Sequence, residues 1–425
     1  MPTRCPELAL SDICVVIVDP YSSGAMLAEA LRARGAKCIA VESSLDMPKS
    51  MRSRFNPGMF QEIIQYDAGY EQTLHAVRRY QPAYVVAGFE SGVELAERLG
   101  NELGLPANGA ALTEARRNKY LMAEAVSRKG LRTALQFLSS DIDAMINWTS
   151  NTLDWPVIVK PPKSVASDDV FCCHSTDEMR KAAKKILSGT NVLGYRNSSV
   201  LVQEFLAGTE YVVDVVSYEG KPKTTAFWQY NRPATPLSDE FVCYDAMTLL
   251  PYTGERQEVL QSYVFKVLDA LDIRFGPAHC ELIWVDGEPV LIEAAARLTA
   301  GINSLLSGIC GGISQLDETL ESMLAPDRFL ATLNDQPHLQ RRAVNLFLMP
   351  NRPGRLVRLR GLDEIRRLPT LHSFSVSAQP GDIVKRVSGL VTLVDEDIES
   401  IKRDINTIRA LEREGIYEVE DGLQA

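Results

Sequence analysis

The sequence lacks the features that mark several large classes of protein. Its 425 residues contain no apolar run near the roughly 20 residues that cross a bilayer, and residues 1–11 lack the cationic start and apolar core of a signal peptide. Its eight cysteines include no CxxC pair, so neither a zinc site nor a disulfide framework is indicated. The formal charge of -10 argues against nucleic acid or an anionic membrane as a partner. We therefore expect a cytoplasmic protein with reduced cysteines.

The first hundred or so residues have the pattern of a small parallel α/β domain. An apolar strand is expected at 13–18, and it leads through a turn at Tyr21 and Ser22 into a helix and a second strand at 37–41. The turn has one glycine where the GxGxxG fingerprint of dinucleotide sites needs three, so a nicotinamide site is not indicated. The turn remains a candidate for contact with a substrate.

Two polar residues follow a further strand of this domain, expected at 84–87. Glu90 and Ser91 come directly after it, at the carboxyl end of the strand, where parallel sheets bind their ligands. They are equally well explained as capping residues of the helix expected at 93–103. We regard Glu90 and Ser91 as candidate substrate-binding residues.

Two lysines lie at positions that would suit the binding of an anion. Residues 116–119 open a helix that is expected to run to about Lys129, and Lys119 is part of its start. The buried strand expected at 155–161 ends on Lys160, and a lysine that closes an apolar strand is unusual. A polar loop follows at 161–169. Taken alone, Lys119 is most simply a charge on a helix surface.

Alternating and apolar runs predict an antiparallel sheet around the strand that ends on Lys160. Its further strands are expected at 199–205, 211–218 and 224–229, and a helix follows at 254–271. Beyond residue 341, strands at 343–349 and 387–394 and helices at 362–368 and 397–414 predict a final α+β lobe.

The stretch from Gly276 to Arg297 is expected to form a β-hairpin, and the length of its turn decides how Glu281 and Glu293 are arranged. A two-residue loop sets these two carboxylates on opposite faces of the hairpin. A three-residue loop with Gly287 left-handed sets His279 opposite Glu293 and keeps Glu281 on the same face.

Clustered glutamates on this hairpin would require a cation. Two carboxylates a few Å apart on an apolar face repel each other and are costly to desolvate, and a hard divalent ion with oxygen ligands is their natural partner. From this stretch alone, an exposed hairpin whose glutamates face water is an equally good interpretation.

The candidate residues follow one another in an order that is typical of one family of enzymes. They are the two lysines, the stretch VQEFLAGTE at 202–210, the two hairpin glutamates and Arg297. In this order the chain resembles the ATP-grasp superfamily of carboxylate–amine ligases, motif by motif over about residues 118–300. It is most similar to the L-amino-acid ligases, which make dipeptides, because of GPAHCE at 276–281 and the ExxxR spacing that ends at Arg297.

The resemblance implies a three-lobed ATP-grasp fold of the α/β and α+β classes, in which the nucleotide is clamped between two antiparallel-sheet lobes. The expected parts are an N-terminal parallel α/β domain at 1–115, a small lobe at 116–206, a large lobe with the metal site at 207–335 and a C-terminal α+β lobe at 336–425. The presence of lysines and an arginine elsewhere in the site then favours the three-residue turn, with His279 beside the metal face.

The resemblance also implies a role for each candidate residue. The ATP site would comprise Lys119, Lys160, Ser164, Ser167, Gln203, Glu204, Phe205, Leu206 and Glu210, with Gln203 at the adenine amine and Glu210 at the ribose. Glu281 and Glu293 would bind Mg²⁺ or Mn²⁺, and Arg297 would neutralise an acyl phosphate, with Lys160 assisting catalysis. The substrates would meet Arg297, His279, Gly301, Glu90, Ser91, Tyr21 and Ser22.

The implied reaction joins an L-amino acid or related carboxylate to a second amino acid and converts ATP to ADP and phosphate. The partners would be small molecules, and a homodimer is compatible with the resemblance. Two departures stand out, since the phosphate loop has no glycine but contains Asp168 and Asp169, and Ala295 stands where the family often has asparagine. They motivate one alternative, a degenerate ATP-binding regulator. A second alternative is another ATP-grasp ligase whose acceptor is not an amino acid, since other members of the superfamily share most of these features.

Overall fold

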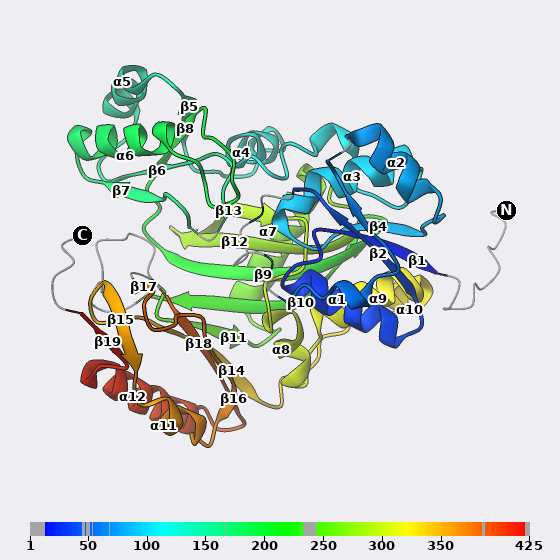
Figure 1. Cartoon of the computed structure of the whole chain (residues 1–425). Coiled ribbons are helices and arrows are strands. Elements are labelled where there is room, and N and C mark those ends of the chain that lie inside the picture. The colour runs from blue at the N-terminus through cyan, green and yellow to red at the C-terminus, as the bar shows by residue number, and fades with distance from the viewer. Residues whose placement is uncertain are drawn as a thin grey trace.

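The computed structural model describes residues 13–44, 47, 52, 54–67, 69–165, 167–232, 244–384 and 387–420. Two parts of the sequence discussed above lie outside the described residues. They are residues 1–11, which lack a signal-peptide pattern, and Ala166 of the polar loop. The described strands form four sheets, and Figure 1 shows the N-terminal domain and the small lobe set against opposite parts of a long central sheet. This mixed architecture confirms the predicted fold class.

The N-terminal domain is a parallel sheet in the strand order β3-β2-β1-β4, with helices on both faces. The side chains of β1 are buried on both faces, which is why it reads as an unbroken apolar run. Glu90 and Ser91 lie in a short 3-10 helix directly after β4. The bounds are β1 (Cys14–Val18), α1 (Ser23–Ala33), β2 (Lys37–Glu42), β3 (Ile63–Gln65), α2 (Tyr70–Arg78), β4 (Tyr84–Ala87), α3 (Val93–Glu102) and short 3-10 helices at Pro57–Met59, Glu90–Gly92 and Ala110–Leu112.

The small lobe is an antiparallel sheet in the order β5-β8-β6-β7, covered by α5 and α6 (Figure 1). The preceding helix, α4, begins at Lys119, and the side chain of Asn118 caps it by accepting from the backbone of Tyr120 and Leu121. The expectation that residues 116–119 all open the helix was therefore wrong by three residues, because Asn118 has the extended backbone of an N-cap. The bounds are α4 (Lys119–Arg128), β5 (Gln136–Ser139), α5 (Ile142–Thr152), β6 (Val157–Lys160), β7 (Phe171–Cys173), α6 (Thr176–Ser188) and β8 (Val200–Glu204).

The single antiparallel sheet expected around Lys160 is in fact two sheets. The chain leaves the small lobe after β8 and enters the central sheet at β9 (Thr209–Tyr218), so these two consecutive strands do not share a sheet. The central sheet has the order β13-β12-β9-β10-β11-β14-β18-β16. The bounds of its other elements before the C-terminal lobe are β10 (Lys221–Asn231), β11 (Ala246–Leu250), α7 (Glu255–Ala270), β12 (Gly276–Val285), β13 (Glu288–Ala295), α8 (Asn303–Ile309), α9 (Gln315–Leu324) and α10 (Pro326–Ala331).

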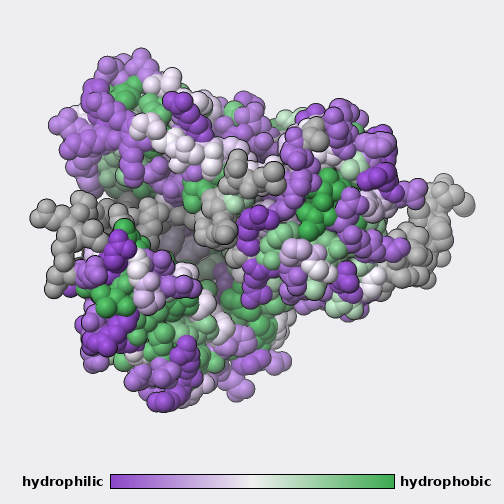
Figure 2. All heavy atoms as spheres, viewed as in Figure 1, coloured by the Kyte–Doolittle hydropathy of each residue, from purple (hydrophilic) through white to green (hydrophobic). Residues whose placement is uncertain are grey.

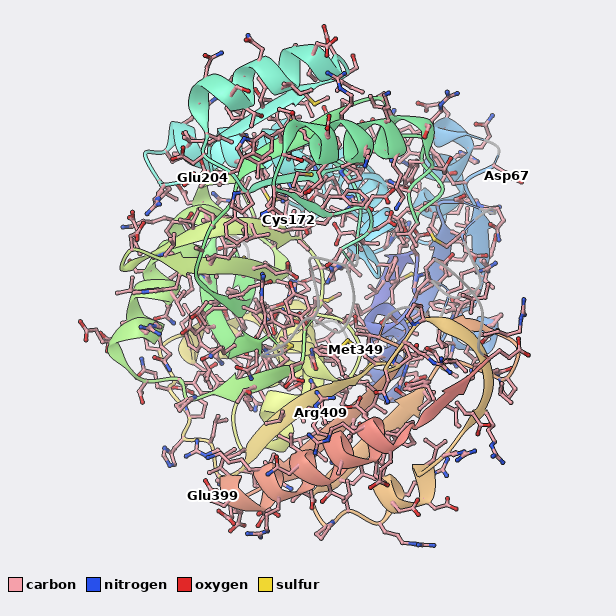
Figure 3. The ribbon with its side chains drawn as sticks, turned by 90° about the vertical axis from the view of Figure 1, so that its left-hand side faces the viewer. Asp67, Cys172, Glu204, Met349, Glu399 and Arg409 are labelled. Atoms are coloured by element: carbon pink, nitrogen blue, oxygen red, sulfur yellow. The ribbon has the colours of Figure 1, made fainter. Side chains whose placement is uncertain are left out.

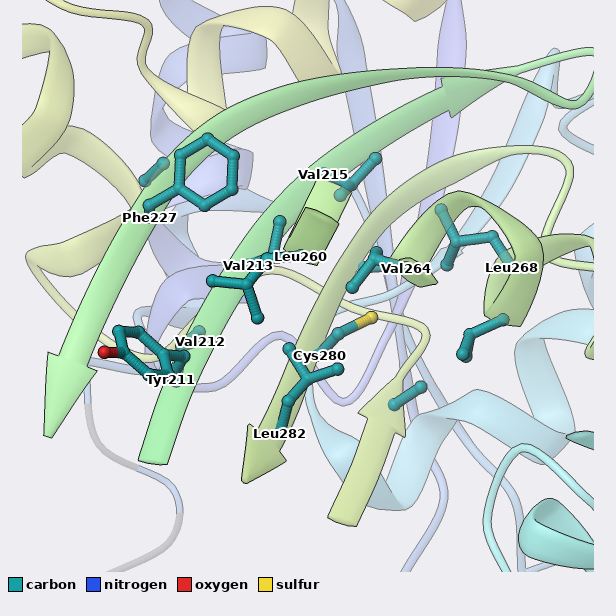
Figure 4. Close-up of a cluster of buried hydrophobic side chains, with 14 of the residues drawn as sticks. Tyr211, Val212, Val213, Val215, Phe227, Leu260, Val264, Leu268, Cys280 and Leu282 are labelled. Carbon is teal, nitrogen blue, oxygen red and sulfur yellow. The ribbon is translucent and has the colours of Figure 1, made fainter. Parts of the chain in front are cut away.

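Helix α7 covers one face of the central sheet and leaves the other face to the small lobe. Tyr211, Val213 and Val215 of β9 pack with Leu260 and Val264 of α7 in the largest core (Figure 4). Because side chains alternate along a strand, the residues between them on β9 point to the opposite face. That face receives the polar residues of the candidate site.

The C-terminal lobe continues the central sheet, because β14 pairs with β11 and with β18. A second sheet of β17, β15 and β19 lies beside it, with α11 and α12 at the lower left of Figure 1. None of the helices in the described ranges is both long and apolar enough to cross a membrane. The bounds are β14 (Arg342–Leu348), β15 (Gly354–Leu359), α11 (Leu362–Arg366), β16 (Leu371–Val376), β17 (Ile383–Val384), β18 (Gly389–Asp395), α12 (Ile398–Glu414) and β19 (Tyr417–Val419).

Candidate active site

A cavity of about 240 Å³ lies between the small lobe and the central sheet. On the face shown in Figure 2, the surface is hollowed between the small lobe and the C-terminal lobe. Figure 3 shows Glu204 near the junction of the small lobe and the central sheet. The cavity brings together Arg297, which was predicted for catalysis and substrate, and every residue predicted for ATP and metal, which are Lys119, Lys160, Ser164, Ser167, Gln203, Glu204, Phe205, Leu206, Glu210, Glu281 and Glu293.

The hairpin of β12 and β13 brings Glu281 and Glu293 together through a β-bulge that the sequence did not predict. Its turn has two residues, since Val285 pairs with Glu288 and both Asp286 and Gly287 are left-handed with φ of 53° and 89°. The favoured three-residue turn was therefore wrong. The register shifts beyond it, where Leu282 pairs with Leu291 but Glu281 pairs with Glu293.

The extra residue in this bulge is Ile292, which has no partner on β12. One inserted residue reverses the alternation of side chains on the rest of β13, so Glu293 comes to the same face as Glu281 and directly opposite it. The expected position of His279 opposite Glu293 was wrong for the same reason, because His279 pairs with Ala295.

The two predicted phosphate lysines approach these carboxylates from the small lobe. Lys119 Nζ lies 3.0 Å from Glu293 Oε1 and donates to the backbone oxygen of Ser164 at 3.1 Å. Lys160 is buried at the end of β6, and burial together with the nearby charge of Lys119 lowers the pKa of Lys160 to about 8. The site thus has two amines and two carboxylates within a largely enclosed space.

The loop after β6 closes without glycine because two of its other residues adopt left-handed backbone conformations. Ser167 has φ of 56° and Asp169 has φ of 53°. The carboxylate of Asp168 accepts from Ser164 Oγ at 2.9 Å and from the backbone of Val192 at 2.8 Å. Asp169 pairs with Lys185 at 3.0 Å. Both acids are therefore engaged with partners in the small lobe.

His279 is part of a hydrogen-bonded row that crosses three strands. Its Nδ1 lies 2.7 Å from Asp214 Oδ1, its Nε2 lies 3.3 Å from Glu281 Oε1, and Trp228 Nε1 donates to Asp214 Oδ2 at 2.8 Å. Burial alone would lower the pKa of His279, but Asp214 and Glu281 outweigh it and raise this pKa to about 9. Asp214 was not among the predicted residues, although one acid in the apolar run of β9 was a usable signal.

Glu210 is held by residues that the sequence analysis also missed. Tyr244 donates to Glu210 Oε1 at 2.7 Å, and Arg232 Nη2 lies 3.4 Å from Oε2. Burial and the charge of Glu281 raise the pKa of Glu210 to about 7. The ring of Tyr230 stacks on that of Tyr244 at 4.1 Å between centroids, and both line the cavity. No motif in the sequence marked these side chains.

Arg297 is tied to the N-terminal domain through Glu90. Its Nε donates to Glu90 Oε2 at 2.6 Å, and Arg117 forms an ion pair with the other oxygen of the same carboxylate. Burial alone would raise the pKa of Glu90, but the two arginines outweigh it and lower this pKa to about 2. The predicted residues Glu90 and Arg297 therefore form one ion cluster with Arg117, in which Glu90 and Arg117 are buried and Arg297 is partly buried.

The remaining predicted substrate residues are held within the N-terminal domain or lie apart from the ATP cavity. Ser91 Oγ donates to the carboxylate of Asp19, and Tyr21 donates to Glu42 Oε1 at 2.8 Å. Ser22 has φ of 51° before α1, and Gly301 has φ of 60° after β13. Their contact with a substrate stays a prediction. Six predicted substrate residues are not among the described residues that line this cavity, and they are Tyr21, Ser22, Glu90, Ser91, His279 and Gly301.

The two predicted metal ligands would supply part of a coordination shell rather than a complete one. Glu281 and Glu293 face each other across the hairpin, and Ala295 offers no side-chain oxygen. Within the described ranges, no group of three or more His, Cys, Asp or Glu side chains is arranged to hold a metal ion. The remaining ligands of a divalent ion at this pair would have to come from phosphate oxygens or water.

Known proteins that resemble this chain cover nearly its whole length. Residues 153–305 match the family model of the ATP-grasp domain, and residues 346–394 match that of the L-amino acid ligase C-terminal domain 2. Dapdiamide A synthase of Enterobacter agglomerans is 30% identical over 409 residues, which cover 94% of this chain and 95% of that protein. The L-arginine-specific L-amino acid ligase of Bacillus subtilis is 23% identical over 306 residues, which cover 71% of each.

The fold is similar to that of a solved ligase. The crystal structure of L-amino acid ligase from Bacillus licheniformis matches with a TM-score of 0.75 at 17% sequence identity, and the match covers 96% of this chain and 99% of that one.

Proposed function

The chain belongs to the ATP-grasp family of L-amino acid ligases, and on this premise we propose that it joins an L-amino acid or related carboxylate to the amine of a second amino acid. ATP is converted to ADP and phosphate through an acyl-phosphate intermediate. The observation that supports this function best is the convergence of Lys119, Lys160, Glu281, Glu293 and Arg297 on one cavity. This set suits transfer of a phosphoryl group, which needs positioned charge and no protein nucleophile.

The nucleotide would lie between the small lobe and the central sheet. Lys119 and Lys160 would hold its phosphates by charge-assisted hydrogen bonds. The strand end at 203–206 would contact the adenine, and Glu210 would accept from the ribose. Tyr244 and Arg232 already contact the two oxygens of Glu210, so they would fix its orientation.

The pair Glu281 and Glu293 fits a hard divalent cation, and we propose Mg²⁺ as the ion. Both donors are carboxylates, they are directly opposite each other, and Lys119 already brings a positive charge to one of them. When bound, such an ion would neutralise charge that develops on the phosphate oxygens. Because position 295 is an alanine, water would have to serve where a side-chain oxygen is absent.

The carboxylate of the first substrate would attack the γ-phosphorus, and ADP would leave. Arg297 would face the resulting acyl phosphate, held in place by its bond to Glu90. The amine of the second substrate would then attack the carbonyl carbon, lose a proton and displace phosphate. The ion pair with the buried Glu90 restrains this arginine, whose side chain keeps 18% of its surface exposed and lines the cavity.

The similarity to ligases along the chain favours neither alternative function raised by the sequence. The acids of the glycine-free loop, which motivated a non-catalytic regulator, are paired with Ser164, Val192 and Lys185 and so do not face the phosphates as free charges. Because ATP and free amino acids are cytoplasmic substrates, we also propose action in the cytoplasm. A homodimer stays a prediction.

A screen of substrate pairs tests this function. The full-length protein, ATP and Mg²⁺ are incubated with pairs of amino acids and related carboxylates, phosphate release is followed, and products are identified by mass spectrometry. We expect phosphate release only when a carboxylate and a second amine are both supplied, with one amide product for each phosphate. Binding of ATP without turnover across a broad panel would contradict the proposal.

A further inference from the structure

Gln203, at the expected adenine end of the cavity, is bonded to a second glutamine on the neighbouring strand. Gln136 of β5 is directly opposite Gln203 of β8, and Gln203 Nε2 donates to Gln136 Oε1 at 3.1 Å. Gln203 is buried with 7% of its surface exposed, and it lines the cavity. Gln136 was not among the predicted site residues.

The contacts of Gln136 leave its amide only one orientation. Its Nε2 donates to the backbone oxygen of Tyr120 at 2.9 Å and to Glu124 Oε1 at 3.3 Å, and both are on α4. A backbone oxygen and a carboxylate can only accept, so the amide nitrogen of Gln136 must point toward α4. Its oxygen must then point toward Gln203.

This orientation is passed on to Gln203. Because Gln136 presents an oxygen, Gln203 must present its nitrogen to Gln136 and keep its own oxygen on the other side. Gln203 Oε1 has no hydrogen-bond partner in the ranges that the structure describes. Because Gln203 lines the cavity, a donor for this oxygen can come from the molecule that occupies the cavity, and the oxygen is left unpaired if that molecule buries it without offering one.

We propose that Gln136 is a positioning residue that makes this site select a 6-aminopurine nucleotide over a 6-oxopurine nucleotide. It does so by holding Gln203 with its carbonyl oxygen toward the base. The exocyclic amine of adenine donates to that oxygen, whereas the 6-oxo group of hypoxanthine or guanine is itself an acceptor and leaves both oxygens unpaired. This inference rests on the proposed use of the cavity for ATP.

Inosine triphosphate is the sharpest probe, because it replaces the 6-amino group of ATP by an oxo group and changes the adjacent ring nitrogen from acceptor to donor. We expect the wild-type protein to prefer ATP, with the side-chain part of this preference worth between about 5-fold and about 150-fold, the range for one buried acceptor left unpaired. Backbone contacts of the hinge add a part that the substitutions below leave in place.

Two substitutions move the preference by different amounts. Gln136→Leu removes both contacts and frees the Gln203 amide to rotate, so the ratio of ATP to ITP kcat/KM should fall by about tenfold. Gln136→Lys offers only donors, which suit Tyr120, Glu124 and a reversed Gln203 that turns its nitrogen toward the base. This variant should lower the ratio further than Gln136→Leu and improve ITP in absolute terms.

The matched control is Gln229→Leu, the same change on β10. Gln229 pairs with Tyr211 and so lies on the α7 face of the central sheet, away from the cavity. The ratio of ATP to ITP kcat/KM in Gln229→Leu should equal that of the wild type. Dissociation constants for ADP and IDP, measured by calorimetry on the full-length proteins, give the same ratio without catalysis.

The two readouts separate this inference from the proposed function. If nucleotides bind but no substrate pair is turned over, the proposed function fails and the ADP to IDP ratio of the variants still decides the role of Gln136. If the ratio stays at the wild-type value in Gln136→Leu and Gln136→Lys while ATP turnover continues, the inference is overturned and the proposed function stands. A protein that binds neither nucleotide overturns both.

Discussion

The buried carboxylate of Glu90 should contribute strongly to stability as well as to the position of Arg297. Burial alone would raise its pKa, but Arg117 and Arg297 outweigh burial and lower this pKa from its ordinary value of 4.5 to about 2. At about 1.4 kcal/mol per pKa unit, the charge of Glu90 stabilises the folded state by about 3 kcal/mol at pH 7. Glu90→Gln should therefore lower the free energy of unfolding by about that amount.

The pH dependence of this difference follows from the direction of the shift. Because the pKa of Glu90 is lower in the folded state, its contribution is fully present above about pH 4.5 and is lost as the pH falls toward about 2. The difference between wild type and Glu90→Gln should be about 0.8 kcal/mol smaller at pH 4 than at pH 7. Urea unfolding followed by tryptophan fluorescence gives both values.

Glu94→Gln is the matched control, since Glu94 is four residues away and forms an exposed pair with Lys163 at 2.9 Å. It should cost less than about 1 kcal/mol. Glu90→Gln should also lower the rate of amide formation, because Arg297 loses its charged partner. A stability loss below about 1 kcal/mol for Glu90→Gln, or one that is the same at pH 4 and pH 7, would refute the buried ion cluster.

Three further predictions concern the cavity. Glu293→Gln should abolish turnover through loss of Mg²⁺, whereas Glu288→Gln at the exposed start of the same strand should not, and unchanged Mg²⁺ dependence in Glu293→Gln would rule out the metal assignment. The pKa of Lys160 is about 8, and phosphate binds the charged form of the amine, so the dissociation constant for ATP should rise above pH 8. Calorimetric titrations measure this rise. Lys160→Met should weaken ATP binding and remove the pH dependence. Asp168→Ala removes the acceptor for Ser164 and Val192 and should raise KM for ATP by about tenfold with little change in kcat, and an unchanged KM would show that the loop closes without this carboxylate.

The sequence predicted the elements that carry a strong local pattern and the family that carries a strong motif order. Strand β4 begins and ends at the predicted residues, and helix α12 begins one residue after its predicted start. The family and the fold class are confirmed. The periodic apolar residues and the capping residues that define such an element all lie within one segment of the chain, so its bounds can be predicted from that segment alone.

Features that depend on contacts between distant segments were not predictable. The bulge at Ile292 is a property of the register between β12 and β13, and an apolar residue in an apolar strand gives no sign of it. The predicted cluster of Glu281 and Glu293 is present, but the bulge produces it and the predicted three-residue turn does not. The ion pairs of Glu90 join residues 27 and 207 positions apart, so no periodicity relates them.

Transfer of oxygen from the substrate carboxylate to phosphate tests the central claim most directly. An amino acid with both carboxylate oxygens labelled as ¹⁸O is supplied with ATP and the amine that gives the highest turnover, and the phosphate is examined by ³¹P NMR or mass spectrometry. An acyl-phosphate route predicts one labelled oxygen in each phosphate and one in each amide, with ADP as the other product. Unlabelled phosphate, or label in AMP, would contradict it.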